Sequence, residues 1–420
     1  MLVTKRDGRK VPFDPSKIET AITKAYWEEE YFPTHPLHPN ATEIAKKIEA
    51  IAVDKDLTVE GIQDIVEKEL MQVDPDTAKK YIIYRNKRSH AREQRSRVME
   101  AVRRRLDAVA VQNSNANVDE RAFSGREKEA SADIQKIYAL DDVLSEEVSA
   151  AHRNMLIYQH DLEKAPLGEH NCLNIDFKKL FNEGFKTRNG DIRPPSTFST
   201  ACQQVAVIFQ CQSQVQFGGV GTVHIDYDLV PFVRKSFAKH FLNGMKWICD
   251  NGVLYDKEEL MDLPINAPLY DEQPKVKKYA MEMLEREMKQ SAEALYHNLN
   301  SLESRAGSQV PFTSINFGRD TSLEGKMISK AMLEASLAGI GQFHRTAIFP
   351  ISIFQYKVGN NANPDDVNYD LKQLALKSLS KRIYPNFCNC DWSQAHENPN
   401  DPDTYFSTMG KRKLSPSKIF

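Results

Sequence analysis

The chain has 420 residues, and a typical size of roughly 150 residues per domain predicts two or three domains with a core large enough to enclose a site. Apolar residues at 41% and charged residues at 27% exclude a collagen-like, mucin-like or wholly disordered chain, and a net charge of −2 excludes a general bias toward nucleic acid. The sequence has no apolar run of the roughly 18 residues needed to span a bilayer, and its N-terminus and six scattered cysteines indicate a cytoplasmic protein.

Residues 1–95 predict a small, mostly helical unit that opens with a β-hairpin. Asp7-Gly8 lies between two strand-like segments, and this pair suits a tight two-residue turn because Gly adopts positive φ without steric cost. Asp14 is a predicted N-cap with Pro15 at the first helical position, and helical apolar spacing follows. The same spacing predicts three further helices, the last of which opens at Asp74-Pro75.

Basic side chains gather at the predicted hairpin. Lys5, Arg6, Arg9 and Lys10 surround the glycine turn, and Lys17 follows in the first turn of the next helix. Cations beside a helix N-terminus suit a phosphate, because the exposed N–H groups and the helix dipole also favour anions. Basic hairpins are often simply solvated, so these residues leave a nucleotide site and an ordinary surface both open.

A basic helix and a polar segment follow. Residues 79–105 carry eleven Lys or Arg and only two acidic residues. This charge favours a solvated linker helix over an anion-binding face for nucleotide phosphates or nucleic acid. The polar, turn-prone residues 112–117 predict a domain boundary, and we assign residues 96–125 to a basic helix and linker.

Residues 126–410 alternate strand-like runs with helical patterns, which favours an α/β layer or barrel. The strand-like runs are residues 173–177, 311–317 and 347–354. The helical runs are residues 132–154, 200–216, 227–241, 276–298, 322–338 and 369–381. The glycines of residues 218–221 follow a helix and precede a strand-like run at 222–225, which is the reverse of a dinucleotide-binding turn, so we expect only a tight turn there.

The cysteines by themselves do not indicate a redox site or a metal site. An isolated cysteine such as Cys172 is most often a small buried apolar residue, and redox chemistry would need a partner that spacing does not supply. Cys388-Asn389-Cys390 lacks the spacing of a zinc half-site and has no second pair, so we predict no metal site.

Two ordered sets of residues resemble a known family. Residues 3–9, 13–18 and 81–85 resemble the ATP-cone, the module that senses ATP and dATP in ribonucleotide reductases. The remainder resembles the catalytic domain of the anaerobic, glycyl-radical ribonucleoside-triphosphate reductases. The matching blocks are, in order, residues 160–162, 166–168, 171–172, 216–219, 309–318, 348–350, 369–375 and 380–385.

The resemblance implies an α/β fold in which an ATP-cone precedes an incomplete ten-stranded α/β barrel, and a homodimer. It implies reduction of ribonucleoside triphosphates to deoxyribonucleoside triphosphates under ATP or dATP control, with a glycyl radical made by a separate radical-SAM activase. By motif, Cys172 matches the cysteine that faces the ribose 2′-OH. The residues that match the ATP-cone's effector site are Val3, Lys5, Arg6, Asp7, Gly8 and Lys17. No nucleic-acid or membrane partner is implied.

The resemblance breaks at the C-terminal end of the sequence. Lys411 stands where the family has the radical cysteine of its Met-Gly-Cys-Arg motif, residues 411–420 look like an unrelated basic tail, and the family's glycyl-radical and zinc-binding segments are absent. We therefore expect an N-terminal portion of such a reductase that is inactive alone. The alternatives are a catalytically dead nucleotide-sensing or dimerising protein and one half of a split reductase. An ATP-cone repressor of reductase genes ranks lower, because those proteins carry an N-terminal zinc ribbon.

Overall fold

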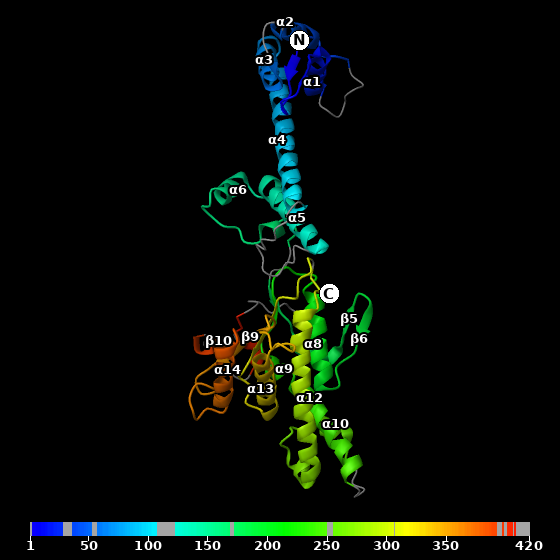
Figure 1. Ribbon diagram of the computed structural model, residues 1–420, viewed down its shortest axis with the longest axis vertical. Coiled ribbons are helices and arrows are strands. Elements are labelled where there is room, and N and C mark those ends of the chain that lie inside the picture. Colours follow the sequence, from blue (N-terminus) through cyan, green and yellow to red (C-terminus); the bar gives the residue numbers. More distant parts are fainter. Residues whose placement is uncertain are drawn as a thin grey trace. The chain divides into compact units, whose positions relative to one another are not determined.

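The computed structural model divides into two compact units, Met1–Arg104 and Arg105–Phe420, each with a hydrophobic core of its own (Figure 1). The residues that it describes are 2–27, 36–52, 57–106, 122–168, 172–249, 255–305, 307–392, 397–398, 401–405 and 407–408. The domain boundary predicted within residues 112–117 and the tail predicted at 411–420 lie outside these ranges. Within them, no helix combines the length and the apolar character that a membrane crossing requires.

The first unit packs four helices with a three-stranded sheet. β1 (Leu2–Thr4) pairs antiparallel with β2 (Lys10–Pro12) and parallel with β3 (Leu57–Thr58). The helices are α1 (Pro15–Trp27), α2 (Ala41–Ala52), α3 (Val59–Val73) and α4 (Pro75–Leu106). Ile22, Ile48 and Leu70 are fully buried in the core that these helices form. The four predicted helices are confirmed, whereas the two residues of β3 are too few to show an alternating pattern in the sequence.

The turn between β1 and β2 differs from the predicted two-residue turn. The N–H of Lys5 donates to the carbonyl of Arg9 at 2.8 Å and that of Gly8 to the carbonyl of Lys5 at 3.0 Å, so residues 6–8 form a three-residue loop. Gly8 has φ +81°, the left-handed conformation that closes such a loop. The carboxylate of Asp7 accepts from the backbone N–H of Arg9 at 3.1 Å and from its guanidinium at 2.8 and 2.6 Å. These bonds stabilise the longer loop.

The second unit is built on a five-stranded parallel sheet with the strand order β10-β9-β8-β7-β4. The strands are β4 (Leu173–Asn174), β7 (Val220–Thr222), β8 (Thr313–Phe317), β9 (Ile351–Tyr356) and β10 (Asn386–Asn389). Parallel neighbours joined by helices are the arrangement of an α/β fold, so the predicted class is confirmed.

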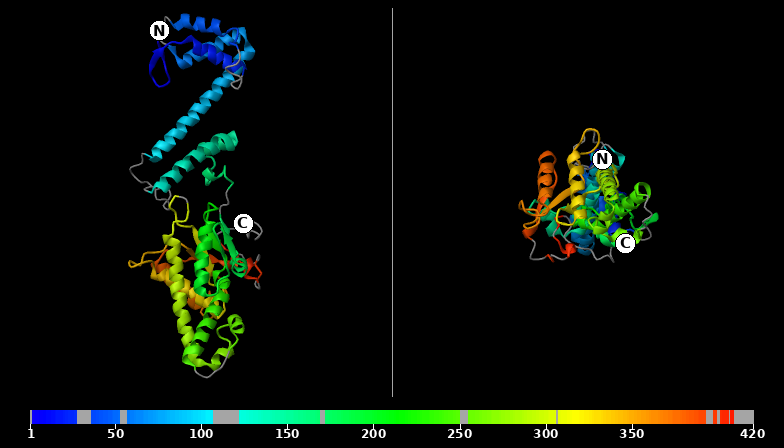
Figure 2. Two further views of the ribbon diagram at one scale, coloured as in Figure 1. Left: turned by 90° about the vertical axis from the view of Figure 1, so that its right-hand side faces the viewer. Right: turned by 90° about the horizontal axis from the view of Figure 1, so that it is seen from below.

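Helices that pack against one another cover one face of this sheet and extend beyond its edge (Figures 1 and 2). They are α8 (Phe198–Gln212), α10 (Val230–Ile248), α12 (Pro274–Ser301), α13 (Leu323–Ala338) and α14 (Tyr369–Lys381). The strands contribute Leu173, Val220, Ile315 and Phe354 to the core that these helices enclose. Because side chains alternate along a strand, the residues next to these on each strand belong to the opposite face of the sheet.

The remaining elements complete the second unit. They are α5 (Phe123–Tyr138), a π-helical turn (Ala139–Val143), α6 (Glu146–Arg153), α7 (Phe177–Glu183), the hairpin of β5 (Phe185–Thr187) and β6 (Gly190–Ile192), α9 (Ile225–Asp228), α11 (Lys257–Asp262), and 3₁₀ turns at Leu162–Lys164, Pro268–Glu272, Cys390–Trp392 and Pro402–Thr404.

The strands predicted at residues 222–225 and 173–177 have other bounds in the structure, where they correspond to β7 and β4. The predicted strand at residues 222–225 begins earlier, at Val220, and two of the glycines expected only in a turn belong to or adjoin this strand. A Cβ at Gly221 would lie 2.6 Å from both Asn174 Oδ1 and Ser314 Oγ, so any side chain at this strand position would force these two buried side chains to shift. The strand predicted at 173–177 ends at Asn174, because Asp176 caps α7 by accepting the N–H of Lys179.

Candidate nucleotide-binding and reductase sites

The first unit contains a cavity of about 160 Å³ beside its sheet. Val3 and Lys5 line it from the hairpin, Lys17 from the first turns of α1, Gln63 from α3 and Tyr81 from α4. The other lining residues are Asp14 and eight apolar residues: Val11, Pro12, Phe13, Ile18, Ala21, Val59, Ile62 and Val66. The cavity therefore joins an apolar wall to two lysines, a combination that suits a ring with a charged tail.

Three of the six predicted effector residues do not line this cavity. Arg6 is held on α3 by an ion pair with Glu60 and by a hydrogen bond from its Nη2 to Gln63 Oε1 at 3.1 Å. Asp7 binds Arg9, and Gly8 closes the loop, as described above. The structure thus brings Val3, Lys5 and Lys17 to the cavity, and it gives Arg6, Asp7 and Gly8 contacts that shape the hairpin.

The start of α1 fixes the position of Lys17. The carboxylate of Asp14 accepts the hydroxyl of Ser16 at 2.6 Å and its N–H at 3.2 Å, and it lies 3.4 Å from Lys17 Nζ. The hydrogen bond from the Ser16 hydroxyl lowers the pKa of Asp14 below its usual value. The exposed Lys17 ammonium therefore lies near the positive end of the helix dipole, where an anion is favoured.

Sequence reasoning missed Gln63 and Tyr81 as lining residues, although Tyr81 belongs to a matching block. Burial raises the pKa of the Tyr81 phenol far above its usual value, so the group is neutral at physiological pH. In the same block, Arg85 contacts three carboxylates of α3, Glu60 at 3.0 Å, Asp64 at 2.7 Å and Glu67 at 2.8 Å. Arg85 thus joins α4 to α3 and does not line the cavity.

In the second unit, Cys172 lies directly before β4 and is exposed, so the expectation of a buried cysteine is wrong. Its Sγ accepts the N–H of Gly219 at 3.2 Å. The side chain of Gln216 fixes the glycine loop, because its Nε2 donates to the carbonyl of Gly219 at 2.8 Å and its Oε1 accepts from Gln212 Nε2 at 3.0 Å. The thiol is therefore held against an ordered backbone turn.

The sheet face opposite the helices is polar near this thiol. Asn174, Gly221 and Ser314 are direct neighbours on β4, β7 and β8, and Asn316 lies two residues further along β8, on the same face. Ser314 and Asn316 are fully buried, yet Ser314 Oγ and Asn316 Oδ1 have no hydrogen-bond partner among the described residues. Leaving such an atom unpaired costs about 1–3 kcal/mol, and ligand hydroxyls would remove that cost.

Ionisable groups gather where the central strands end. Asp226 accepts the N–H groups of Gly318, Arg319 and Asp320 at 2.8, 3.1 and 3.1 Å, and burial raises its pKa to about 6. Burial also disfavours a charged His224, but Asp228 at 3.3 Å and Asp403 at 3.0 Å together raise the His224 pKa to about 10. Sequence reasoning missed this cluster, which forms only when the strand ends meet.

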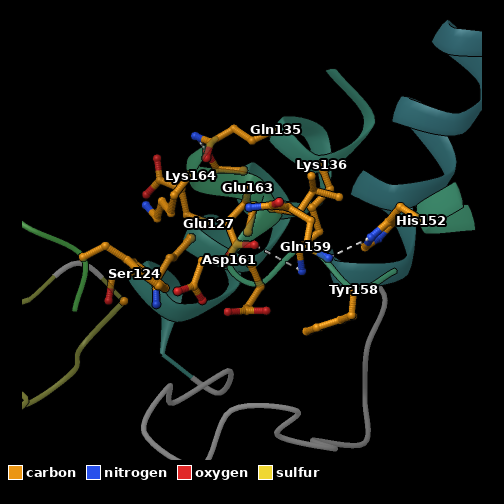
Figure 3. A pocket seen from close by; sticks show the side chains of 17 residues that line it. Ser124, Glu127, Gln135, Lys136, His152, Tyr158, Gln159, Asp161, Glu163 and Lys164 are labelled. Atoms are coloured by element: carbon orange, nitrogen blue, oxygen red, sulfur yellow. Dashed lines mark hydrogen bonds and ion pairs between the residues drawn. The ribbon is translucent and has the colours of Figure 1, made fainter. Parts of the chain in front are cut away.

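A cavity of about 940 Å³ lies between α5 and residues 158–164 (Figure 3). Its wall carries several charged side chains of both signs, and Phe217 and Gly307 also line it. In Figure 3, Ser124 and Lys164 lie toward one end of the cavity and His152 toward the other. Phe217 is two residues before Gly219, whose N–H contacts Cys172.

Comparison with known proteins identifies the family. Residues 114–416 match the family model described as anaerobic ribonucleoside-triphosphate reductase, and residues 1–90 match the ATP cone domain. The chain is 32% identical over 394 residues to the anaerobic ribonucleoside-triphosphate reductase of Haemophilus influenzae, a match that covers 93% of this chain and 52% of that protein. The Escherichia coli protein of the same name is also 32% identical, with 93% of this chain and 51% of that protein covered.

A solved structure of the anaerobic ribonucleotide reductase from Thermotoga maritima, in complex with dATP and CTP, superposes with a TM-score of 0.43 at 17% identity, over 69% of this chain and 46% of that one. From the sequence matches, the chain belongs to the anaerobic ribonucleoside-triphosphate reductase family of oxidoreductases and carries an ATP cone. It spans about half the length of the curated relatives that it matches.

Proposed function

We propose that the second unit forms part of the catalytic barrel of a reductase that converts ribonucleoside triphosphates to deoxyribonucleoside triphosphates, with Cys172 facing the ribose 2′-OH. The observation that carries this proposal is the exposed thiol beside a sheet face whose buried Ser314 Oγ and Asn316 Oδ1 have no hydrogen-bond partner within the described part of the chain. A ribose supplies the hydroxyls that such atoms lack, and Gly221 leaves room beside them. The five parallel strands would make one half of the family's ten-stranded barrel.

Loss of the 2′-hydroxyl as water requires a proton on that oxygen, and we assign its donation to the thiol of Cys172. The abstraction of the ribose 3′-hydrogen that starts the reaction would be supplied by the family's radical cysteine, once it had received the radical from the glycyl position. Within the described ranges, no group of three or more His, Cys, Asp or Glu side chains could hold a metal ion.

Protection of Cys172 against alkylation tests this proposal on the full chain. Under anaerobic conditions, iodoacetamide should label Cys172 at a rate measured by peptide mass spectrometry, and CTP should slow the labelling more than dCTP does. The reason is that dCTP lacks the hydroxyl that faces the thiol. Equal protection by CTP and dCTP would contradict the assignment of Cys172 to the 2′ side.

We further propose that the first unit binds ATP or dATP as an effector. Ligand pockets commonly measure about 300–1,000 Å³, so a cavity of about 160 Å³ would enclose the base and leave the phosphates outside, beside Lys5 and Lys17. The family's homodimer and its radical-SAM activase are proposed partners, and sedimentation of the full chain at micromolar concentration tests the dimer.

A second candidate function is nucleotide sensing without turnover. Lys411, at the position where the family's radical cysteine is expected, favours it, because an ammonium group cannot carry a thiyl radical. The purified chain should then bind ATP but form no deoxyribonucleotide when supplied with activase, formate and ribonucleoside triphosphate. Measurable deoxyribonucleotide would contradict this second candidate.

A further inference from the structure

The proposed function requires a triphosphate next to the ribose, and that triphosphate needs positive counter-charge close to Cys172. We propose that Lys128, Lys164 and Arg305, with the side-chain amide of Gln309, form a subsite for the phosphates of the nucleotide substrate. The subsite lies at the Phe217 end of the large cavity. This inference rests on the proposed reductase function and adds to it the residues that hold the phosphates.

Close contacts fix the position of the Lys128 side chain. Its Nζ donates to Gln309 Oε1 at 2.9 Å, although the two residues are 181 positions apart in the chain. Gly307 has φ +82°, and a Cβ at this position would lie 2.5 Å from Lys128 Cδ, so only glycine lets the lysine pass. Beside it, the hydroxyls of Ser124 and Ser308 are hydrogen-bonded at 2.6 Å. The lysine therefore belongs to a built site and is not a free surface chain.

Gln309 supplies an independent sign of a missing ligand. Its side chain is 1% exposed, and its Nε2 has no hydrogen-bond partner among the residues that the structure describes. A lysine can only donate, so Oε1 must be the atom that faces Lys128, and Nε2 is left as a buried donor. An anionic oxygen bound beside Lys128 would accept from this N–H group.

Two further cations meet at Phe217. Lys164 Nζ lies 5.1 Å and Arg305 Cζ 6.0 Å from the centre of its ring, and the Arg305 guanidinium donates to its carbonyl. Because Gly219 follows two residues later and contacts Cys172 Sγ at 3.2 Å, one short loop has cations at one end and the thiol at the other. A nucleotide whose ribose lies at Cys172 would extend its phosphates along this loop.

The charges around Lys128 also favour an added anion. Burial lowers the pKa of Lys128; Glu129 and Glu163 oppose this shift, and Arg305 and Lys164 add to it. Bound phosphate oxygens would offset the repulsion among the three cations.

Two of the four carboxylates that line the cavity, Glu129 and Glu163, have basic partners. Glu129 Oε2 lies 3.6 Å from Arg105 Nη2, and Glu163 Oε2 lies 3.6 Å from Lys136 Nζ. These pairs weaken the repulsion that Glu129 and Glu163 would exert on a phosphate at the Phe217 end. The cavity volume, about 940 Å³, is at the upper end of the range of about 300–1,000 Å³ for ligand pockets.

The test uses the full chain, anaerobic iodoacetamide and the labelling rate of Cys172. CTP at about ten times its Kd should slow labelling about tenfold, whereas cytidine at the same concentration should protect far less. Lys128→Met and Lys164→Met should each raise the CTP concentration for half-protection by about tenfold or more, because each removes a charge-assisted hydrogen bond. Lys179→Met, at an exposed position on α7, is the matched control and should behave as the unaltered chain.

The possible outcomes distinguish a failure of the phosphate subsite from a failure of the proposed reductase function. Unchanged half-protection by CTP in both Lys128→Met and Lys164→Met, or protection by cytidine as strong as by CTP, overturns the phosphate subsite and leaves the reductase function standing. Protection of Cys172 by no nucleotide in the unaltered chain overturns both. Inorganic tripolyphosphate distinguishes the ligand source, because full protection by it alone would assign the subsite to free polyphosphate rather than to a nucleotide. Gly307→Ala, which displaces Lys128 without removing its charge, should weaken CTP protection as the lysine variants do.

Discussion

The two units of this protein present candidate nucleotide sites of opposite physical character. The cavity of the first unit is mostly apolar with two lysines, so burial of a base would supply much of the binding free energy. The candidate reductase site of the second unit consists of buried polar atoms on a sheet face, beside a thiol. Polar sites of this kind gain little from burial and depend on exact placement. The second site should therefore respond more steeply to small structural changes than the first.

The largest effect is expected from a single methyl group in the second unit. Gly221→Ala would put a Cβ 2.6 Å from Asn174 Oδ1 and Ser314 Oγ, in the middle of the sheet. Overpacking of this kind typically costs about 1–3 kcal/mol, so the second unit should unfold at a lower temperature. Calorimetry would measure the shift, while ATP binding by the first unit should stay unchanged.

Gly190 offers the matched control for this change. It lies in the hairpin of β5 and β6, and a Cβ there would meet no atom within 4 Å. Gly190→Ala should therefore leave the transition temperature nearly unchanged. Equal melting temperatures of the Gly221→Ala and Gly190→Ala chains would show that Asn174 and Ser314 do not pack closely against Gly221.

A smaller effect is expected from pH, and it should have opposite signs in the two units. The pKa of His224 is raised to about 10, so its charged form stabilises the second unit fully below about pH 6.5, and this stability is lost as pH rises toward 10. We expect a loss of roughly 1–2 kcal/mol, because one of its carboxylate partners, Asp403, is partly exposed. In the first unit, Ser16 lowers the pKa of Asp14 and Arg6 lowers that of Glu60, so stability is lost there as pH falls through these values.

Calorimetric scans from pH 2 to pH 10 would separate these contributions, with His224→Gln as the variant that removes the alkaline loss. A second unit that gains stability between pH 7 and pH 10 would contradict the assignment of a charged His224.

The two sites also differ in how far the sequence predicts them. Val3, Lys5 and Lys17 lie within fifteen residues on a strand, a turn and a helix start, so local patterns bring them together. Gln63 and Tyr81 reach the same cavity only through the packing of α3 and α4, which local patterns do not encode. The turn length was mispredicted because the Asp-Gly pair suits both two- and three-residue loops, and the Arg9 contact with Asp7 selects the longer one.

In the second unit, only Cys172 could be predicted, and it came from a motif rather than from its surroundings. Ser314 and Asn316 become neighbours of Asn174 through strand register, and β4 and β7 are too short to show an alternating pattern. Gly221 was expected in a turn, because a glycine run gives no sign of a packed strand until its neighbours are known. The phosphate subsite joins residues from α5 and from the segment before β8, which are 181 positions apart.

The smallest effects should separate the roles of neighbouring basic residues in the first unit. Lys5→Ala and Lys17→Ala should each weaken ATP binding by about tenfold, because both lysines line the cavity and can reach phosphates. Arg6→Ala should weaken it by only about twofold, because Arg6 is engaged by Glu60 and Gln63 and acts through the hairpin. Isothermal titration with ATP on the full chain, with Cys172→Ser as a control in the other unit, measures all three. If Arg6→Ala had the largest effect, ATP would have to displace Glu60, and the phosphates would lie over α3 rather than beside Lys5 and Lys17.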